Sequence, residues 1–224
     1  MKITFLGQAS LLFETEGKKI LIDPYFSDSV GAMNEAKHRR VPVEDWLFRI
    51  RPDVILFTHC HIDHYDPETA EKLLKGAEGI TVLGPMSVWQ EARKLGGNHN
   101  YVMFSPGTHW TEGKAEILAV PACHSDPDAI GAVICAEGKK YYVTGDTLYN
   151  ESIFPALPES LEAVFVPVNG QGNNMNAVDA EHFAERCKAR FTVPLHVGML
   201  DDMTPDIYKG NNRVLPEIYK EIKL

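Results

Sequence analysis

Three histidines and one aspartate occur within six residues, in the run His59-Cys-His-Ile-Asp-His64. The apolar run Val54-Ile-Leu-Phe57 precedes it and has the length and branching of a buried strand, so the polar side chains should lie on the loop that leaves its end. Asp66-Pro67 then supplies an N-cap and a first-turn proline, which start a helix. Imidazole and carboxylate groups together are ligands for first-row divalent metals. The run therefore predicts a metal site, since so many polar groups beside a strand end would otherwise lose hydration without gaining a partner.

Three more potential ligands each follow an apolar run later in the chain. They are His124 after Ile117-Leu-Ala-Val120, Asp146 after Tyr141-Tyr-Val-Thr144, and His196 after Phe191-Thr-Val193. Together with the first run, they stand in the order of the metal-binding motifs of the metallo-β-lactamase-fold hydrolases, a superfamily that the sequence resembles from Leu6 to His196. The resemblance implies an α+β fold, a four-layer αββα sandwich, and we expect residues 1–224 to form one domain of this kind.

Carried over residue by residue, the resemblance implies a site for two divalent ions. His59, His61 and His124 would hold the first ion, Asp63, His64 and His196 the second, and Asp146 would bridge the two. A hydroxide between the ions would be the nucleophile, and Asp63 would orient it and transfer a proton in a later step. Mixed imidazole and carboxylate ligation suits zinc first and manganese second, with iron as a further candidate.

Other residues are candidates for supporting roles. The resemblance implies that Asp23 hydrogen-bonds a metal ligand, although Asp23-Pro24 also reads as an ordinary turn. Asn169 is a candidate substrate contact, or else a turn-stabilising residue beside Gly170. The cluster His38-Arg39-Arg40 could contact an anionic group of a substrate or simply be solvated.

The remaining pattern predicts mixed α and β structure in two successive blocks. Three strands at 2–6, 10–13 and 19–22 suggest an antiparallel meander, and 24–45 reads as a long loop. His99 and His109 fall in turn-like sequence and are expected at the surface or the pocket rim. Helices are expected at 67–75, 87–95, 178–190 and 214–222, and further strands at 54–57, 80–83, 101–104, 115–120, 131–135, 140–144, 162–166 and 191–194.

Composition narrows the functional class. The 224 residues are 44% apolar and 24% charged, as in ordinary globular proteins, and the net charge of −9 argues against a nucleic-acid partner. No apolar run approaches the roughly 20 residues of a membrane span and no leader precedes the first strand, so the expected location is cytoplasmic. A homo-oligomer remains open.

The four cysteines are scattered and lack a C-x-x-C pair, so neither a disulfide framework nor a structural zinc knuckle is indicated. Cys60 and Cys123 each lie beside a proposed ligand. Thiolate ligation by either residue therefore stays open, next to a role as a small buried apolar side chain.

A narrower resemblance concerns the end of the chain. Val166-Pro-Val-Asn-Gly170, Asn174-Met-Asn176 and Val193-Pro-Leu-His-Val-Gly-Met199 resemble the L-ascorbate-6-phosphate lactonase branch, although the chain is shorter and has Gln8 where relatives often carry histidine. We therefore expect a metal-dependent hydrolase, lactonase-like or esterase-like, that acts on a small anionic ester or lactone. The alternatives are a phosphodiesterase or nuclease with the same metals and a non-catalytic binding module. No G-x-S-x-G, P-loop or dinucleotide-binding motif competes with this reading.

Overall fold

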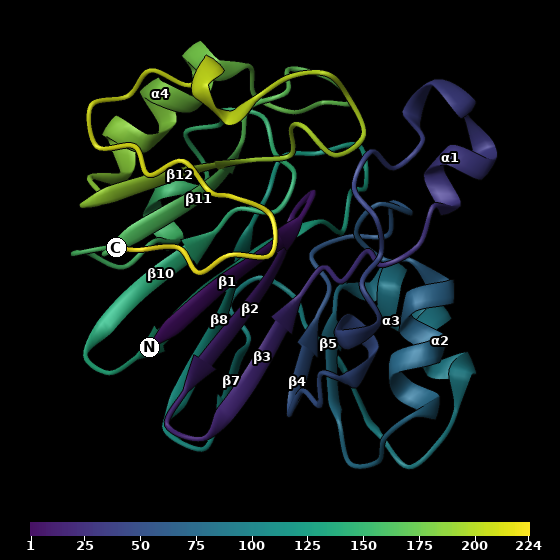
Figure 1. Cartoon of the computed structure of the whole chain (residues 1–224). Helices are drawn as coiled ribbons and strands as arrows, with labels where there is room; N and C mark the ends of the chain where they lie inside the picture. The colour runs from purple at the N-terminus through teal and green to yellow at the C-terminus, as the bar shows by residue number, and fades with distance from the viewer.

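The computed structural model describes all 224 residues and contains two six-stranded sheets that pack face to face (Figure 1). The first sheet has the order β1-β2-β3-β4-β5-β6, with bounds Lys2–Gly7, Ser10–Thr15, Lys18–Ile22, Val54–Leu56, Thr81–Gly84 and Asn100–Met103. The second has the order β12-β11-β10-β9-β8-β7; in chain order from β7 its strands are His109–Glu112, Ala115–Pro121, Ile130–Ala136, Lys139–Val143, Ala163–Pro167 and Phe191–Leu195.

Four α-helices and five short 3₁₀ turns accompany the sheets. The α-helices are α1 (Ser29–Met33), α2 (Pro67–Lys75), α3 (Met86–Ala92) and α4 (Ala177–Cys187). The 3₁₀ turns are Glu35–Lys37, Asp45–Arg49, Arg93–Leu95, Phe154–Ala156 and Pro205–Ile207. None of the helices is both long and apolar enough to cross a bilayer.

Both sheets follow the same plan, an antiparallel meander that continues into parallel strands. In the first sheet β1–β3 are antiparallel and β3–β6 parallel, and in the second β7–β10 are antiparallel and β10–β12 parallel. Parallel strands end at the same edge of a sheet. Strand β8 runs in the same direction as β10, because both pair antiparallel with β9. The residues that directly follow β3, β4, β8, β10 and β12 therefore lie at one edge of the sandwich.

Three large apolar clusters define four layers. The largest cluster lies between the sheets and draws on both, a second joins the first sheet to α2 and α3, and a third joins the second sheet to α4. Figure 1 shows α2 and α3 on one outer face and α4 on the opposite one. The predicted αββα sandwich is confirmed.

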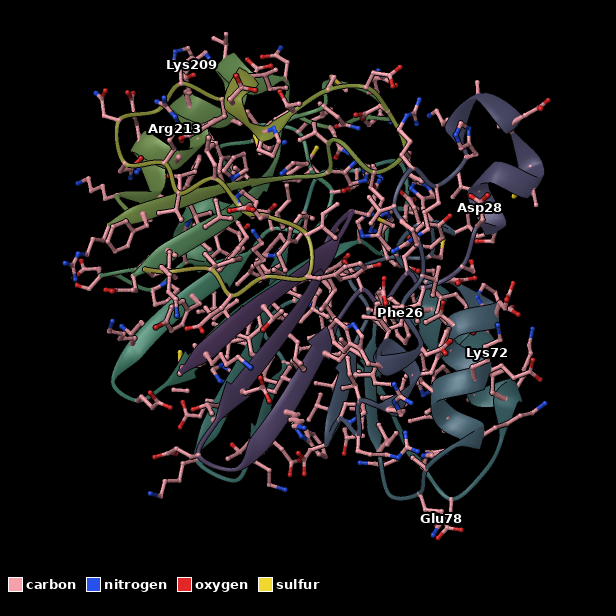
Figure 2. All side chains as sticks on the ribbon, viewed as in Figure 1. Phe26, Asp28, Lys72, Glu78, Lys209 and Arg213 are labelled. Atoms are coloured by element: carbon pink, nitrogen blue, oxygen red, sulfur yellow. The ribbon has the colours of Figure 1, made fainter.

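Helix α2 begins at Pro67, where the sequence predicts, three residues after His64. The Asp66 side chain accepts hydrogen bonds from the backbone N–H groups of Glu68 and Thr69. Such a cap contributes about 1 kcal/mol to stability. Leu73 is buried on the inner face of α2 while Lys72 lies on its outer face (Figure 2). The cap and this buried face fix the far end of the loop that carries the histidines.

The prediction of a closing helix at 214–222 is wrong. This segment contains Pro216, makes a turn at Glu217–Lys220 and lies along the edges of both sheets. Phe5 N–H donates to the carbonyl of Lys220, and Val214 N–H to that of Thr192. The free backbone groups of the edge strands β1 and β12 need partners. Pairing along these edges therefore outweighs the local helical pattern.

Smaller differences concern element bounds. His109 lies in β7, a strand that was not predicted. The helix predicted at 178–190 ends earlier, at Cys187, because Lys188 adopts a left-handed conformation with φ of 52°. The loop predicted at 24–45 contains α1 and the turn Glu35–Lys37. Because α1 has no buried residue, the apolar pattern contained no signal for it.

Candidate metal centre and its pocket

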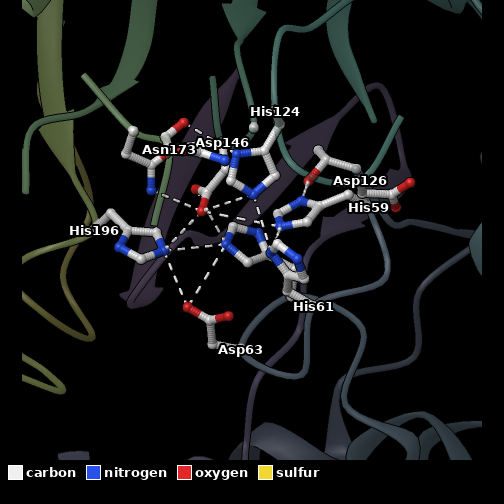
Figure 3. A network of polar contacts seen from close by, with 12 residues as sticks. His59, His61, Asp63, His124, Asp126, Asp146, Asn173 and His196 are labelled. Atoms are coloured by element: carbon white, nitrogen blue, oxygen red, sulfur yellow. Dashed lines mark hydrogen bonds and ion pairs between the residues drawn. The ribbon is translucent and has the colours of Figure 1, made fainter. Parts of the chain in front are cut away.

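The seven predicted metal ligands converge at the sheet edge where β4, β8, β10 and β12 end (Figure 3). Their potential ligand atoms form three overlapping groups, each with all atoms within 4.8 Å of one another. The groups are His59, His61 and His124; His59, His64 and Asp146; and Asp63, His64 and His196. The fold thus brings together residues that are up to 137 positions apart in the sequence, from His59 to His196.

The first group consists of imidazole nitrogens alone. Nδ1 of His61 lies 3.1 Å from Nε2 of His59 and 3.0 Å from Nε2 of His124. Zinc–nitrogen bonds of about 2.0–2.1 Å in a tetrahedral site place neighbouring nitrogens roughly 3.4 Å apart. The three nitrogens therefore have a spacing that suits one small divalent ion.

Asp146 lies between the first group and the third, which consists of Asp63, His64 and His196. Nε2 of His196 lies 3.2 Å from Nε2 of His64 and 3.0 Å from Oδ2 of Asp63. Oδ1 of Asp146 is 3.2 Å from Nε2 of His64, and Oδ2 of Asp146 is 3.8 Å from Nε2 of His124. The Asp146 carboxylate thus faces both groups, as a bridging ligand must.

An unsatisfied oxygen supports this placement. Oδ1 of Asp146 is buried and makes no hydrogen bond of good geometry, in spite of its proximity to His64. Leaving a buried carboxylate oxygen without a partner is costly. A cation at this point would supply the missing partner, so the residues present fit a metal ion.

A ring of polar groups orients the histidines from outside. Nδ1 of His64 lies 2.8 Å from Oδ2 of Asp23, and Asp23 also accepts hydrogen bonds from the backbone N–H and the hydroxyl of Thr58. The Thr58 hydroxyl lies 3.0 Å from Nδ1 of His59, and the Asn173 carbonyl 3.1 Å from Nδ1 of His124. These contacts turn the other ring nitrogen, Nε2, toward the site. Asp23 occupies the supporting position that the resemblance implies, whereas Thr58 had no distinguishing signal in the sequence.

His196 is held by two amide side chains. The amide nitrogen of Gln8 lies 2.9 Å from Oδ2 of Asp63 and 3.2 Å from Nδ1 of His196, and the amide nitrogen of Asn169 lies 3.1 Å from the same Nδ1. The backbone N–H of His196 also donates to the Gln8 carbonyl. Asn169 therefore positions a predicted ligand as well as lining the adjacent cavity. Its contact with substrate stays a prediction.

The buried carboxylates and histidines of the site shift one another's pKa values. Burial opposes protonation of His196, but the carboxylates of Asp146 and Asp63 outweigh it and raise the His196 pKa to about 10. Burial also disfavours the anion of Asp146, yet His196 and His64 hold its pKa well below the usual range. The pKa of His59 is lowered, chiefly by burial and by His64. The two carboxylates thus stay ionised and make this edge of the sandwich attractive to cations.

A cavity of about 420 Å³ opens beside the ligands. Asp63 lines it and Asp146 does not, so Asp63 is the only carboxylate among the seven ligands that a bound molecule can touch. The lining residues are Gln8, Val30, Met33, Lys37, Cys60, His61, Ile62, Asp63, Asn169, Gln171, His196, Leu200 and Asp201.

The basic cluster at 38–40 has structural contacts and lines no part of this cavity. The Arg39 guanidinium donates to the carbonyls of Tyr25 and Val41 and to the Tyr219 hydroxyl. Arg40 pairs with Asp202. The proposed contact of this cluster with a substrate is therefore not supported.

The other open candidates also lie outside the ligand groups. Neither Cys60 nor Cys123 belongs to any of the three groups, which argues against thiolate ligation. His99 is half-buried against the Leu74 carbonyl, His109 is exposed in β7, and neither lines the cavity. The pocket-rim alternative for these two histidines is therefore wrong.

Asn174 is a functional candidate that the sequence reading missed. It is buried, and its amide donates to Oδ2 of Asp146 at 2.8 Å, which orients the carboxylate. We expect Asn174→Ala to weaken metal binding about 10–100-fold, because residues that orient a ligand commonly contribute this much. Metal titration against a competing chelator measures the change. Asn173→Gly is the matched control, because glycine tolerates the positive φ of this position and keeps the backbone carbonyl that contacts His124. Equal losses of metal affinity in both variants would contradict the role of Asn174.

Comparison with known proteins gives a consistent result. The family model described as "Beta-lactamase superfamily domain" matches residues 18–197. A UPF0173 metal-dependent hydrolase of Carboxydothermus hydrogenoformans is 30% identical over 221 residues, which cover 92% of this chain and 89% of the relative. Another, of Geobacillus sp. (strain WCH70), is 31% identical over 212 residues, which cover 88% of this chain and 85% of the relative. A metallo hydrolase of the archaeon Ignicoccus hospitalis superposes with a TM-score of 0.79 at 20% identity, covering 99% of this chain and 97% of that one, and thus shares the fold.

Proposed function

Because the chain belongs to the β-lactamase superfamily, we propose that it is a metal-dependent hydrolase that binds two divalent ions and cleaves a small anionic ester or lactone. The observation that carries the proposal is the convergence of seven metal-binding side chains, with a buried Asp146 oxygen that lacks a hydrogen-bond partner. Support for hydrolysis also comes from the names of the relatives.

The residues divide between two ion positions as their spacing suggests. His59, His61 and His124 would hold one ion, Asp63, His64 and His196 the other, and Asp146 would bridge them. Two such ions would supply a water of lowered pKa and polarise the oxygen of the scissile group. Zinc suits the imidazole-rich first position, and manganese or iron are alternatives.

Asp63 is the residue best placed to move protons. It reaches the cavity, whereas the Asp146 side chain is only 6% exposed and does not line it. Gln8 holds one Asp63 oxygen by a hydrogen bond of 2.9 Å. Asp63 can therefore take a proton from the attacking water and return it to the leaving oxygen of the substrate.

The size and charge of the cavity favour a small molecule over nucleic acid. About 420 Å³ accommodates a metabolite-sized ligand, and Lys37 is the only lysine or arginine in the lining. A nuclease gains its affinity from several basic side chains along the phosphate backbone, and this chain has a net charge of −9. The lactone preference rests on the segments around Asn169 and His196 that resemble the ascorbate-6-phosphate lactonase branch.

A substrate panel tests the proposal. Metal-loaded protein should hydrolyse carboxylate-bearing lactones and p-nitrophenyl esters at least about tenfold faster, in kcat/KM, than bis-p-nitrophenyl phosphate, a difference of about 1.4 kcal/mol in transition-state stabilisation. Turnover of the phosphodiester alone would replace the proposal with a phosphodiesterase. No turnover of any member, with ions shown to be bound, would contradict a hydrolase of this class.

A further inference from the structure

The lining of the cavity combines chemically different residues. His61, Asp63 and His196 belong to the predicted metal ligands. Another part of its wall comes from residues 24–41, which we call the arm and which contribute Val30, Met33 and Lys37. Ile62 and Leu200 add apolar surface to the lining. A molecule that fills the cavity therefore touches metal ligands, apolar side chains and one ammonium group.

Lys37 stands out among the lining residues because its charge is unused. It is exposed, its Nζ makes no hydrogen bond, and it forms no ion pair, whereas many other lysines of this acidic chain are paired with a carboxylate. Asp201, the other charged lining residue outside the predicted ligand set, already accepts hydrogen bonds from the backbone N–H groups of Gly198 and Met203. Lys37 is thus the only cation free to receive an anionic group.

The arm is capped locally before Lys37 and anchored to the rest of the chain after it. Oδ1 of Asn34 accepts from the N–H of Ala36 at the start of the turn Glu35–Lys37. Two residues after Lys37, the guanidinium of Arg39 is fixed by the Tyr25 carbonyl and the Tyr219 hydroxyl. The backbone of Lys37 is therefore held in place while its long side chain stays free to meet a ligand.

We propose that Lys37 forms an anion subsite, which selects substrates carrying a carboxylate or phosphate group remote from the bond that is cleaved. The inference rests on the proposed function and deepens it. The reacting group lies at Asp63 and the metal ligands, an apolar body packs against Val30, Met33 and Leu200, and the anionic end meets the Lys37 ammonium. An exposed pair of this kind contributes modestly and is weakened by salt, so a selectivity of threefold to tenfold is expected.

Equilibrium binding tests the subsite independently of turnover. Metal-loaded wild-type protein is titrated with saturated α,ω-dicarboxylates of four to seven carbons and with their monoamides, which replace one carboxylate by a neutral group of similar shape. For at least one chain length, the dicarboxylate should bind the wild type about threefold to tenfold more tightly than its monoamide. In Lys37→Gln this ratio of dissociation constants should fall to between one and two. An ω-phosphonate series at the favoured length shows whether a carboxylate or a phosphate-like group is preferred.

The control is Lys209→Gln, an exposed lysine on the α4 side of the molecule, far from Asp28 in the arm (Figure 2). It should keep the wild-type ratio. A ratio near one in the wild type at every chain length, or an equal ratio in wild type and Lys37→Gln, would overturn the subsite.

Kinetics separate this inference from the proposed function. With a pair of esters that differ only in a terminal carboxylate or amide, Lys37→Gln should lose three- to tenfold in kcat/KM for the anionic ester and retain the wild-type value for the neutral one. Equal losses for both esters would overturn the subsite while leaving the hydrolase intact. If the wild type cleaves neither these esters nor any member of the substrate panel, the hydrolase proposal fails and the binding ratios still decide the role of Lys37.

Discussion

Asp146→Asn is expected to lower kcat/KM on the best ester or lactone by about 10³-fold, or about 4 kcal/mol of transition-state stabilisation. The amide has nearly the same shape as the carboxylate but is neutral. Because Asp146 faces both ligand groups, its charge would serve both proposed ion positions at once. The variant should also bind fewer ions per chain, measured by elemental analysis after dialysis against a weak chelator.

Asp128→Asn is the matched control for this variant. Asp128 is exposed, belongs to the same loop as His124, and contributes only its backbone N–H to Asp126. The control should keep both the ion content and the activity of the wild type. Full activity of Asp146→Asn together with reduced ion content would refute the bridging role, because catalysis would then not depend on the shared carboxylate.

Removal of the metal ions should lower the melting temperature by about 8 °C or more. Ions present at 1,000 times their dissociation constant stabilise the folded state by about 4 kcal/mol, and each kcal/mol corresponds to about 2–4 °C in a chain of this size. The physical reason is burial: Asp146, His59 and His64 form a group at the sheet edge whose donor atoms need a cationic partner. Calorimetry with and without a strong chelator measures the shift.

Re-addition of single metals makes this experiment specific. Zinc, manganese or ferrous iron should restore the melting temperature, whereas calcium should not, because it requires six to eight oxygen ligands and five of the seven donors are histidines. Asp146→Asn should show a smaller chelator effect than the wild type. A chelator effect of equal size in both proteins would place the stabilising ion elsewhere in the chain.

Local features of the fold were readable because they depend on neighbouring residues. Asp66-Pro67 specifies the start of α2 through a side-chain cap and a fixed φ, and the structure begins the helix at Pro67. The same holds for β4, whose apolar run predicts a strand that ends just before the ligands. In contrast, residues 214–222 follow the edges of two sheets. The edge strands need hydrogen-bond partners, but they are far away in the sequence, so the local pattern at 214–222 does not reveal this pairing.

Apart from Asp23 and Asn169, the side chains that orient the ligands could not be predicted either. Thr58 has no distinguishing signal, and the sequence comparison that singled out Gln8 and Asn174 gave neither of them this role. All three act only because the fold places them against His59, His196 and Asp146 respectively. The basic cluster shows the converse. Arg39 has the chemistry to bind an anion, but the structure commits it to the arm and leaves Lys37, two residues earlier, facing the cavity.

The sequence by itself determined which side chains can bind metal and the strand that precedes each of them, because ligand chemistry and strand patterning are local properties. Only the tertiary structure decided that His124, Asp146 and His196 meet the run His59–His64. That meeting depends on the order and direction of twelve strands, which bring the ends of β4, β8, β10 and β12 to one edge. Long-range pairing of this kind is set by the packing of whole sheets, so no short stretch of residues encodes it.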